Sequence, residues 1–272
     1  MTTYTAQQFG RTVRDDFNNR RSRNNVFEHA SLRASAGLAL ESRALGHPDF
    51  ERLAIGERAT APMVAVFLDL SKFTRRTFWD DQDETVDLAH AVLTGFIEVV
   101  TRFGGHPLGL RGDGLFAGFS PGDRAFTATM ALSASAFALN AVRNEVNPWL
   151  DQRGFERIQA RAGLDYGDIT FVRTGSRTSS EVNPLGFAAN FAAKCEKTAD
   201  SWEIVVGEGL RNLLPNEVSH FSNHKFSPKR YTRGDEVRRY YFYDYKWEAT
   251  VAHLSGVTEQ LHGHPTSQIS AR

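Results

Sequence analysis

The apolar run from Val64 to Leu70 constrains the fold more than any other feature of this 272-residue chain. Its length suits a β-strand, and a nearly continuous apolar composition is typical of a central strand that is covered on both faces. The run holds one charged residue, Asp69, close to its carboxyl end. We therefore expect a sheet whose central strand presents a carboxylate where the strand ends.

Periodicity elsewhere predicts helices and hairpins around this strand. Apolar residues recur at helical spacing from Asp83 to Phe103, and Gly104-Gly105 ends that helix. Two short apolar segments then flank Gly112-Asp113-Gly114, which predicts a hairpin with a tight turn. The remaining expected elements are a helix over 123–150, a second hairpin formed by 158–165 and 168–172 around Tyr166-Gly167, a helix over 186–198, and strands at 203–206 and 240–243.

The order β-α-β-β-α-β-α-β, over about residues 63 to 245, predicts an α+β fold with a ferredoxin-like βαββαβ core and additional helices and strands. We expect one sheet with helices mainly on one face. This core defines a main domain over 61–247, preceded by an N-terminal helical extension over 1–60 and followed by a flexible C-terminal tail over 248–272. A helical piece near 28–43 would make the extension either a solvated arm or an arm for oligomerisation or regulation.

Composition narrows the classes of partner and location. Lys and Arg total 32, as do Asp and Glu, so the formal net charge is zero and no nucleic-acid partner is expected. Cys195 is the single cysteine, which excludes an intrachain disulfide and favours a cytoplasmic location, and the polar first twenty residues do not predict a signal peptide. The uncharged segment 125–142 contains Thr, Ser and Asn, which predicts a buried helix, with no membrane association.

Asp69 and Asp113 indicate a metal site only when they are considered together. Each alone is explained by ordinary local structure, Asp69 as a turn residue and Asp113 as part of a Gly-Asp-Gly hairpin turn. A hairpin laid beside the Val64–Leu70 strand, however, would bring its tip against the end of that strand. Paired carboxylates can hold two metal ions ~4 Å apart, an arrangement suited to in-line attack on phosphorus. Mg²⁺ favours a few carboxylate oxygens together with substrate phosphates.

The helix over 186–198 offers a second polar set. Asn190 and Lys194 are four residues apart and therefore share one helix face. An amide and an ammonium on one face are suited to a ribose and a triphosphate, although a solvated polar face explains the same pattern.

Four segments together resemble the catalytic domain of class III nucleotidyl cyclases. Their order and spacing match that family across roughly residues 63 to 245, which makes 61–247 the catalytic domain. The segments are Val66-Phe-Leu-Asp-Leu-Ser-Lys-Phe-Thr74, Gly104-Gly-His-Pro-Leu-Gly-Leu-Arg-Gly-Asp-Gly114, Arg161-Ala-Gly-Leu-Asp-Tyr-Gly167 and Asn183-Pro-Leu-Gly-Phe-Ala-Ala-Asn-Phe-Ala-Ala-Lys194.

The resemblance implies a phosphorus-oxygen lyase that acts as a head-to-tail homodimer with composite sites. Asp69 and Asp113, helped by the Leu70 carbonyl, would bind two Mg²⁺ or Mn²⁺ ions. From the partner chain, Asn190 would orient the ribose, and Lys194 stands where the family usually has an arginine that stabilises the transition state. The residues implied in phosphate binding are Ser71, Phe73 and Thr74 through their amides, and a late lysine, Lys229 or Lys225.

The base-reading positions depart from the purine cyclases. Gly109 and Asn183 stand where adenylyl cyclases of this class usually have a lysine and an aspartate, and the residues typical of guanylyl cyclases are also missing. An intact metal pair without purine readers resembles the bacterial pyrimidine cyclases of the Pycsar anti-phage systems. Asn183 can recognise a pyrimidine edge and Arg111 can donate to a base carbonyl, which favours UTP over CTP.

The expected reaction is conversion of UTP to 3′,5′-cyclic UMP and pyrophosphate. The cyclic UMP would be a second messenger for a separate effector. Alternatives are a cyclase that uses CTP or ATP, and a catalytically inactive cyclase-like module that binds nucleotide. A polymerase-type palm also carries two carboxylates on a ferredoxin-like sheet, but the neutral charge argues against a template-binding enzyme.

Overall fold

The computed structural model describes residues 4–24, 45–120 and 122–251. Its strands are β1 (Arg58–Ser71), β2 (His106–Arg111), β3 (Gly114–Phe119), β4 (Gln159–Gly175), β5 (Ser180–Leu185), β6 (Ile204–Gly207), β7 (Phe221–Asn223), β8 (Lys229–Arg233), β9 (Glu236–Tyr240) and β10 (Phe242–Tyr245). Its helices are α1 (Ala6–Asn24), α3 (Phe73–Trp79), α4 (Gln82–Arg102), α5 (Arg124–Ala141), α6 (Asn147–Gln152), α7 (Phe187–Thr198) and α8 (Glu208–Arg211). A π-helical segment, η2 (Val142–Val146), joins α5 to α6, and η3 (Val218–His220) and η4 (Trp247–Ala249) are 3₁₀ turns.

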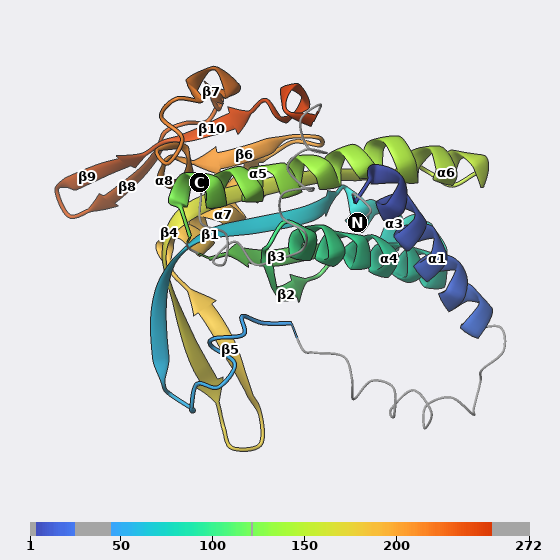
Figure 1. Ribbon diagram of the computed structural model, residues 1–272, viewed down its shortest axis with the longest axis horizontal. Helices are drawn as coiled ribbons and strands as arrows, with labels where there is room; N and C mark the ends of the chain where they lie inside the picture. The colour runs from blue at the N-terminus through green and yellow to red at the C-terminus, as the bar shows by residue number, and fades with distance from the viewer. Residues whose placement is uncertain (1–3, 25–44, 121, 252–272) are drawn as a thin grey trace.

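The main sheet has the order β2-β3-β1-β4-β6-β10-β7, with β5 paired to β4. Its first four strands, crossed by α4 between β1 and β2 and by α5 between β3 and β4, form the predicted ferredoxin-like core. The crossover through α7 then brings β6 alongside β4 in parallel. β8 and β9 form a separate hairpin, and both this hairpin and the β4–β5 ribbon project from the body of the protein (Figure 1).

Side chains of β1 point alternately to the two faces of the sheet, and each face has its own hydrophobic cluster. Val64, Val66 and Leu68 face the cluster that α1, α4 and α5 complete, and those helices lie together over the sheet in Figure 1. Met63 and Ala65 point to the opposite face, where they pack with residues of α7. Both faces of β1 are thus covered, as its apolar composition predicts.

The long helical stretch Arg124–Gln152 has the length and hydropathy of a membrane span, yet 78% of its most apolar window is buried inside the fold. A buried core helix passes the same test of composition. The predicted buried helix at 125–142 is therefore confirmed.

The N-terminal helix α1 packs on the domain. Phe9, Val13 and Phe17 recur at helical spacing and are completely buried in the main core cluster. The expected helical piece at 28–43 lies outside the described residues, as does most of the tail after 248. Helix α1 therefore belongs to the same packed core as the main sheet.

The second predicted hairpin is wrong. β4 runs unbroken through Tyr166 and Gly167, because it pairs with the whole length of β1, from Arg58 opposite Val172 to Ser71 opposite Gln159. Gly167 allows close packing instead of a turn, since a Cβ there would lie 3.2 Å from the Ala188 side chain of α7. The actual reversal comes later, between β4 and β5, which was not predicted.

The last predicted strand, 240–243, is also displaced. Tyr240 ends β9, whereas β10 begins at Phe242 and pairs with β6 and β7. The Tyr240 hydroxyl donates to the Asp165 carboxylate at 2.9 Å, which ties the end of the β8–β9 hairpin to the sheet. The aromatic run 240–243 is thus shared between two strands that pair with different partners, β9 with β8 and β10 with β6 and β7.

Candidate active site

Strand register places the two predicted carboxylates side by side, where β1 ends and the β2–β3 turn lies. Asp69 of β1 is directly opposite Gly114, the first residue of β3, and the Leu70 amide donates to the Asp113 carbonyl at 3.4 Å. The turn between β2 and β3 uses Gly112 at φ 65°, in the left-handed region that favours glycine. A Cβ on Gly114 would lie 3.0 Å from Oδ1 of Asp69, so glycine also leaves room for the carboxylate. The predicted hairpin and its contact with the central strand are confirmed.

The electrostatics of this pair fit a cation site. Burial, and next the charge of Asp69, raise the pKa of Asp113 above its ordinary value. Two carboxylates that repel each other in a partly buried place gain from a shared positive charge. Their hard oxygen donors suit Mg²⁺ or Mn²⁺, so Asp69 and Asp113 fit the metal ions that the resemblance implies.

A cavity of about 420 Å³ opens beside the pair. Of the predicted site residues, it is lined by Asp69, Leu70, Phe73, Thr74, Arg111 and Asp113. Residues without a predicted role also line it, including Lys72, Arg161, Glu196 and Lys197. The cavity thus combines acidic and basic groups, as expected of a site for a metal ion and phosphates.

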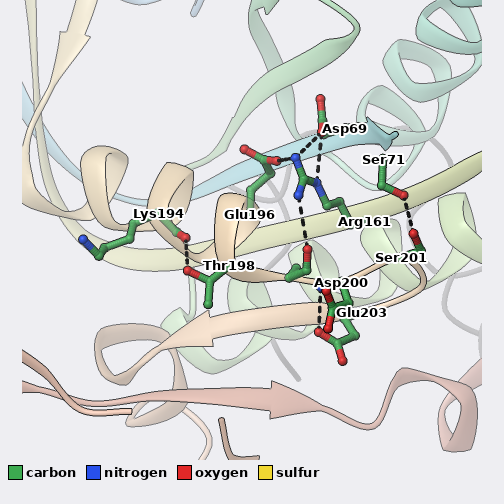
Figure 2. A network of polar contacts seen from close by, with 10 residues as sticks. Asp69, Ser71, Arg161, Lys194, Glu196, Thr198, Asp200, Ser201 and Glu203 are labelled. Carbon is green, nitrogen blue, oxygen red and sulfur yellow. Dashed lines mark hydrogen bonds and ion pairs between the residues drawn. The ribbon is translucent and has the colours of Figure 1, made fainter. Parts of the chain in front are cut away.

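The turn from β1 into α3 borders this cavity. Lys72 adopts the left-handed region at φ 62° and ψ 15°, which is uncommon for a residue with a side chain. Ser71 is buried and its hydroxyl donates to Ser201 at 2.9 Å, which fixes the end of β1 to the loop after α7 (Figure 2). The side chain of Ser71 is therefore engaged within the fold, and only its main chain is available for the predicted phosphate contact.

The sequence interpretation missed a charged cluster next to Asp69. Arg161, opposite Asp69 on β4, donates to Oδ2 of Asp69 from Nε at 3.0 Å and from Nη2 at 2.9 Å. The same Nη2 lies 2.6 Å from Oε1 of Glu196 on α7, and Nη1 donates to the Ala199 carbonyl at 3.2 Å. Figure 2 shows these three side chains converging. Burial, and next the charge of Asp69, raise the pKa of Glu196 to about 7.

One signal in the sequence could have identified Glu196. Ala193, Glu196 and Lys197 follow the i, i+3, i+4 spacing of one helix face, and all three line the cavity. The prediction followed Asn190 and Lys194 instead.

The other predicted residues lie away from this cavity in the single chain. Asn190 is exposed on α7, and the ammonium of Lys194 points away from Asp69 and Arg161 (Figure 2). Asn183 lies on β5 opposite Val172. Gly109 lies on β2, Lys229 is exposed on β8, and Lys225 forms an ion pair with Asp200 at 2.6 Å. The composite site implied by the resemblance would join some of these residues to the cavity of a second copy.

Known proteins resemble this chain in sequence and, separately, in fold. No protein-family model matches the chain. In sequence, a cytidylate cyclase of Escherichia coli is 25% identical over 204 residues, which cover 70% of this chain and 44% of that protein. A cytidylate cyclase of Staphylococcus aureus is 21% identical over 179 residues, covering 64% of this chain and 42% of that protein. The chain thus spans less than half the length of these curated relatives.

Solved structures share the fold. The adenylyl cyclase CyaB from P. aeruginosa superposes with a TM-score of 0.59 at 18% identity, covering 70% of this chain and 95% of that one. The guanylyl cyclase Cya2 gives a TM-score of 0.58 at 19% identity, covering 71% and 94%. The chain therefore has the class III nucleotidyl cyclase fold, and its sequence is related to those of the cytidylate cyclases.

Proposed function

We propose that the chain is a pyrimidine nucleotide cyclase that converts a pyrimidine nucleoside triphosphate to its 3′,5′-cyclic monophosphate and pyrophosphate. The observation that carries the proposal is the pairing of Asp69 with the β2–β3 turn, which places two carboxylates beside a cavity large enough for phosphates. The relationship in sequence to cytidylate cyclases supports it.

In this reaction the ribose 3′-oxygen forms a bond to the α-phosphorus, the bond from that phosphorus to the bridging oxygen of the β-phosphate breaks, and the hydroxyl proton is released. Asp69 and Asp113 would hold two divalent metal ions, with the Leu70 carbonyl as a further ligand. Bound there, the metals would acidify the hydroxyl and neutralise charge that develops on the phosphates. The amides of Ser71 to Thr74 would bind phosphate oxygens.

We propose that the remaining groups come from a second copy in a homodimer. Asn190 would orient the ribose, Lys194 would stabilise the transition state, and Lys229 would bind the terminal phosphates. Lysine keeps the positive charge of the usual arginine without its planar fork. A mixture of Asp69→Ala and Asn190→Ala chains should recover one intact composite site per mixed dimer, and absence of recovery would contradict shared sites.

The base is either uracil or cytosine. Donors on Asn183 and Arg111 favour the two carbonyls of UTP, whereas the names of the related proteins favour CTP. Substitution of Asn183 or Arg111 should change the preference between bases more than it weakens metal binding. Equal losses on all four nucleotides would rule out both residues as base readers.

The decisive assay incubates purified protein with ATP, GTP, CTP or UTP and Mn²⁺, and identifies the product by mass. Cyclic UMP or cyclic CMP as the main product supports the proposal, and loss of that product in Asp69→Ala and Asp113→Ala, with the fold retained, supports the metal assignment. Mainly cyclic AMP would contradict the pyrimidine assignment, and no product from any nucleotide would favour a nucleotide-binding regulatory module.

We further propose that the cyclic product is a second messenger in anti-phage defence, read by a separate effector. In cells that carry the matching effector, wild-type protein should reduce phage yield and the Asp69→Ala variant should not. Equal yields with both proteins would contradict this role.

A further inference from the structure

One guanidinium serves two carboxylates at the candidate metal site. Arg161 donates two hydrogen bonds to Oδ2 of Asp69, from Nε at 3.0 Å and from Nη2 at 2.9 Å. Its Nη2 also lies 2.6 Å from Oε1 of Glu196. The side chains of Asp69 and Glu196 are 17% and 9% exposed, so both charges depend on partners inside the protein. Asp113 lines the same cavity as these three residues, and its pKa is raised by burial and next by the charge of Asp69.

The side of the guanidinium that faces α7 is fixed. Gly163 shares a face of β4 with Arg161, and a Cβ there would lie 2.0 Å from the Glu196 amide nitrogen. The helix therefore rests directly on the strand backbone, with Glu196 beside Arg161. The Ala199 carbonyl, at the end of α7, accepts a further hydrogen bond from Nη1 at 3.2 Å. Besides Asp69, Arg161 thus has two partners, Glu196 on α7 and the carbonyl of Ala199 directly after it.

The other side of the guanidinium contacts a carboxylate that also belongs to the candidate metal site. Oδ2 of Asp69 accepts both bonds from Arg161, and the same carboxylate faces the cavity with Asp113. A divalent cation bound to these carboxylates would repel a guanidinium that contacts one of its ligands. Loss of the Asp69 contact would leave a buried arginine partly unpaired unless another carboxylate received it, and Glu196 is already in contact.

We propose that Arg161 is an internal counter-cation that a divalent metal ion displaces from Asp69, and that Glu196 is a positioning residue that holds the guanidinium after displacement. The inference rests on the proposed function only for the assignment of the metal to Asp69 and Asp113. In the free chain Arg161 competes with the metal, and Glu196 reduces that competition by offering Arg161 a second carboxylate. Metal affinity then depends on Arg161 and Glu196 as well as on the two carboxylate ligands, Asp69 and Asp113.

The test measures Mn²⁺ binding to the full chain without nucleotide, by calorimetry and by the electron paramagnetic resonance signal of free Mn²⁺. Arg161→Gln should lower the Kd roughly tenfold or more, because the competing charge is gone. Glu196→Gln should raise the Kd by a similar factor, because the guanidinium then remains on Asp69. Lys197→Gln is the matched control: it removes an equal charge from the same cavity, at a residue of α7 next to Glu196, and should change the Kd less than about twofold.

A double-mutant cycle shows whether Glu196 affects metal binding by positioning Arg161 or only by its own negative charge. If Glu196 acts through Arg161, Glu196→Gln should weaken binding much less in the Arg161→Gln background than in the wild type. Additive effects, or an unchanged or higher Kd in Arg161→Gln, would overturn the inference. Arg161→Lys, which keeps the charge without the fork, should give an intermediate Kd and provides a second variant if Arg161→Gln unfolds.

Asp69→Asn distinguishes this inference from the proposed function. If that variant binds Mn²⁺ as tightly as the wild type, the metal assignment itself is wrong, and the inference falls with it. If Asp69→Asn loses binding while Arg161→Gln does not gain it, only the inference is wrong.

Discussion

Asp165 makes the stability of the protein depend on pH. It is completely buried on β4, where its carboxylate accepts hydrogen bonds from the Tyr166 amide at 2.9 Å, the Leu210 amide at 3.3 Å and the Tyr240 hydroxyl at 2.9 Å. Loss of solvation outweighs these bonds and raises the pKa of Asp165 from 3.8 to about 7. The folded chain therefore binds this proton more tightly than the unfolded chain does.

The size of the effect follows from the two pKa values. A folded-state pKa above the unfolded value gives stabilisation that is complete below 3.8 and is lost as the pH rises through about 7. Each tenfold change in proton affinity is worth ~1.4 kcal/mol, so the difference between the unfolded pKa of 3.8 and the folded pKa of about 7 corresponds to roughly 4 kcal/mol in the free energy of unfolding. Asp165→Asn removes this titration and keeps the shape of the side chain.

The assay is urea unfolding, followed by tryptophan fluorescence at a series of pH values from about 4 to about 8. The stability of Asp165→Asn relative to the wild type should increase with pH, by up to about 4 kcal/mol across this range. Asp168→Asn, which removes an exposed carboxylate from the same strand, is the control and should follow the wild type. Parallel curves for the wild type and Asp165→Asn would refute the assigned role of burial.

Three further outcomes are expected. Gly163→Ala should destabilise the protein by ~1–3 kcal/mol or more in urea unfolding, because its Cβ would meet the backbone of α7, and wild-type stability would contradict that contact. Phe17→Ala should cost about 3–5 kcal/mol, since α1 buries this ring completely; a loss below about 1 kcal/mol would mean that α1 is not packed in solution. Cys195 is 1% exposed and burial raises the pKa of its thiol well above the ordinary value, so a thiol reagent should label it only in urea, and rapid labelling of native protein would contradict this placement.

The sequence determined the elements whose signals are local. Apolar composition predicted the doubly covered strand β1, helical periodicity predicted α4, and Gly112-Asp113-Gly114 predicted the β2–β3 turn. The juxtaposition of Asp69 and Asp113 was predicted by combining these signals with the assumption that the hairpin lies beside the strand, and the antiparallel pairing of β1 with β3 confirms that placement. The sequence was sufficient for the strand, the helix and the turn because each of them depends on residues close together in the chain.

Only the tertiary structure decided properties that depend on pairing between distant segments. Tyr166-Gly167 resembles a turn, but pairing with β1 along fourteen residues keeps β4 continuous there. The helical spacing of Phe9, Val13 and Phe17 in α1 does not say what covers them, and only the fold shows that they pack in the main core cluster with residues of α4 and α5. Arg161 meets Asp69 through the register of β4 on β1, and Glu196 meets Arg161 because Gly163 lets α7 rest on the strand. Register and helix rotation are set by the packing of the whole core, so no local pattern in the sequence identifies such a charged cluster.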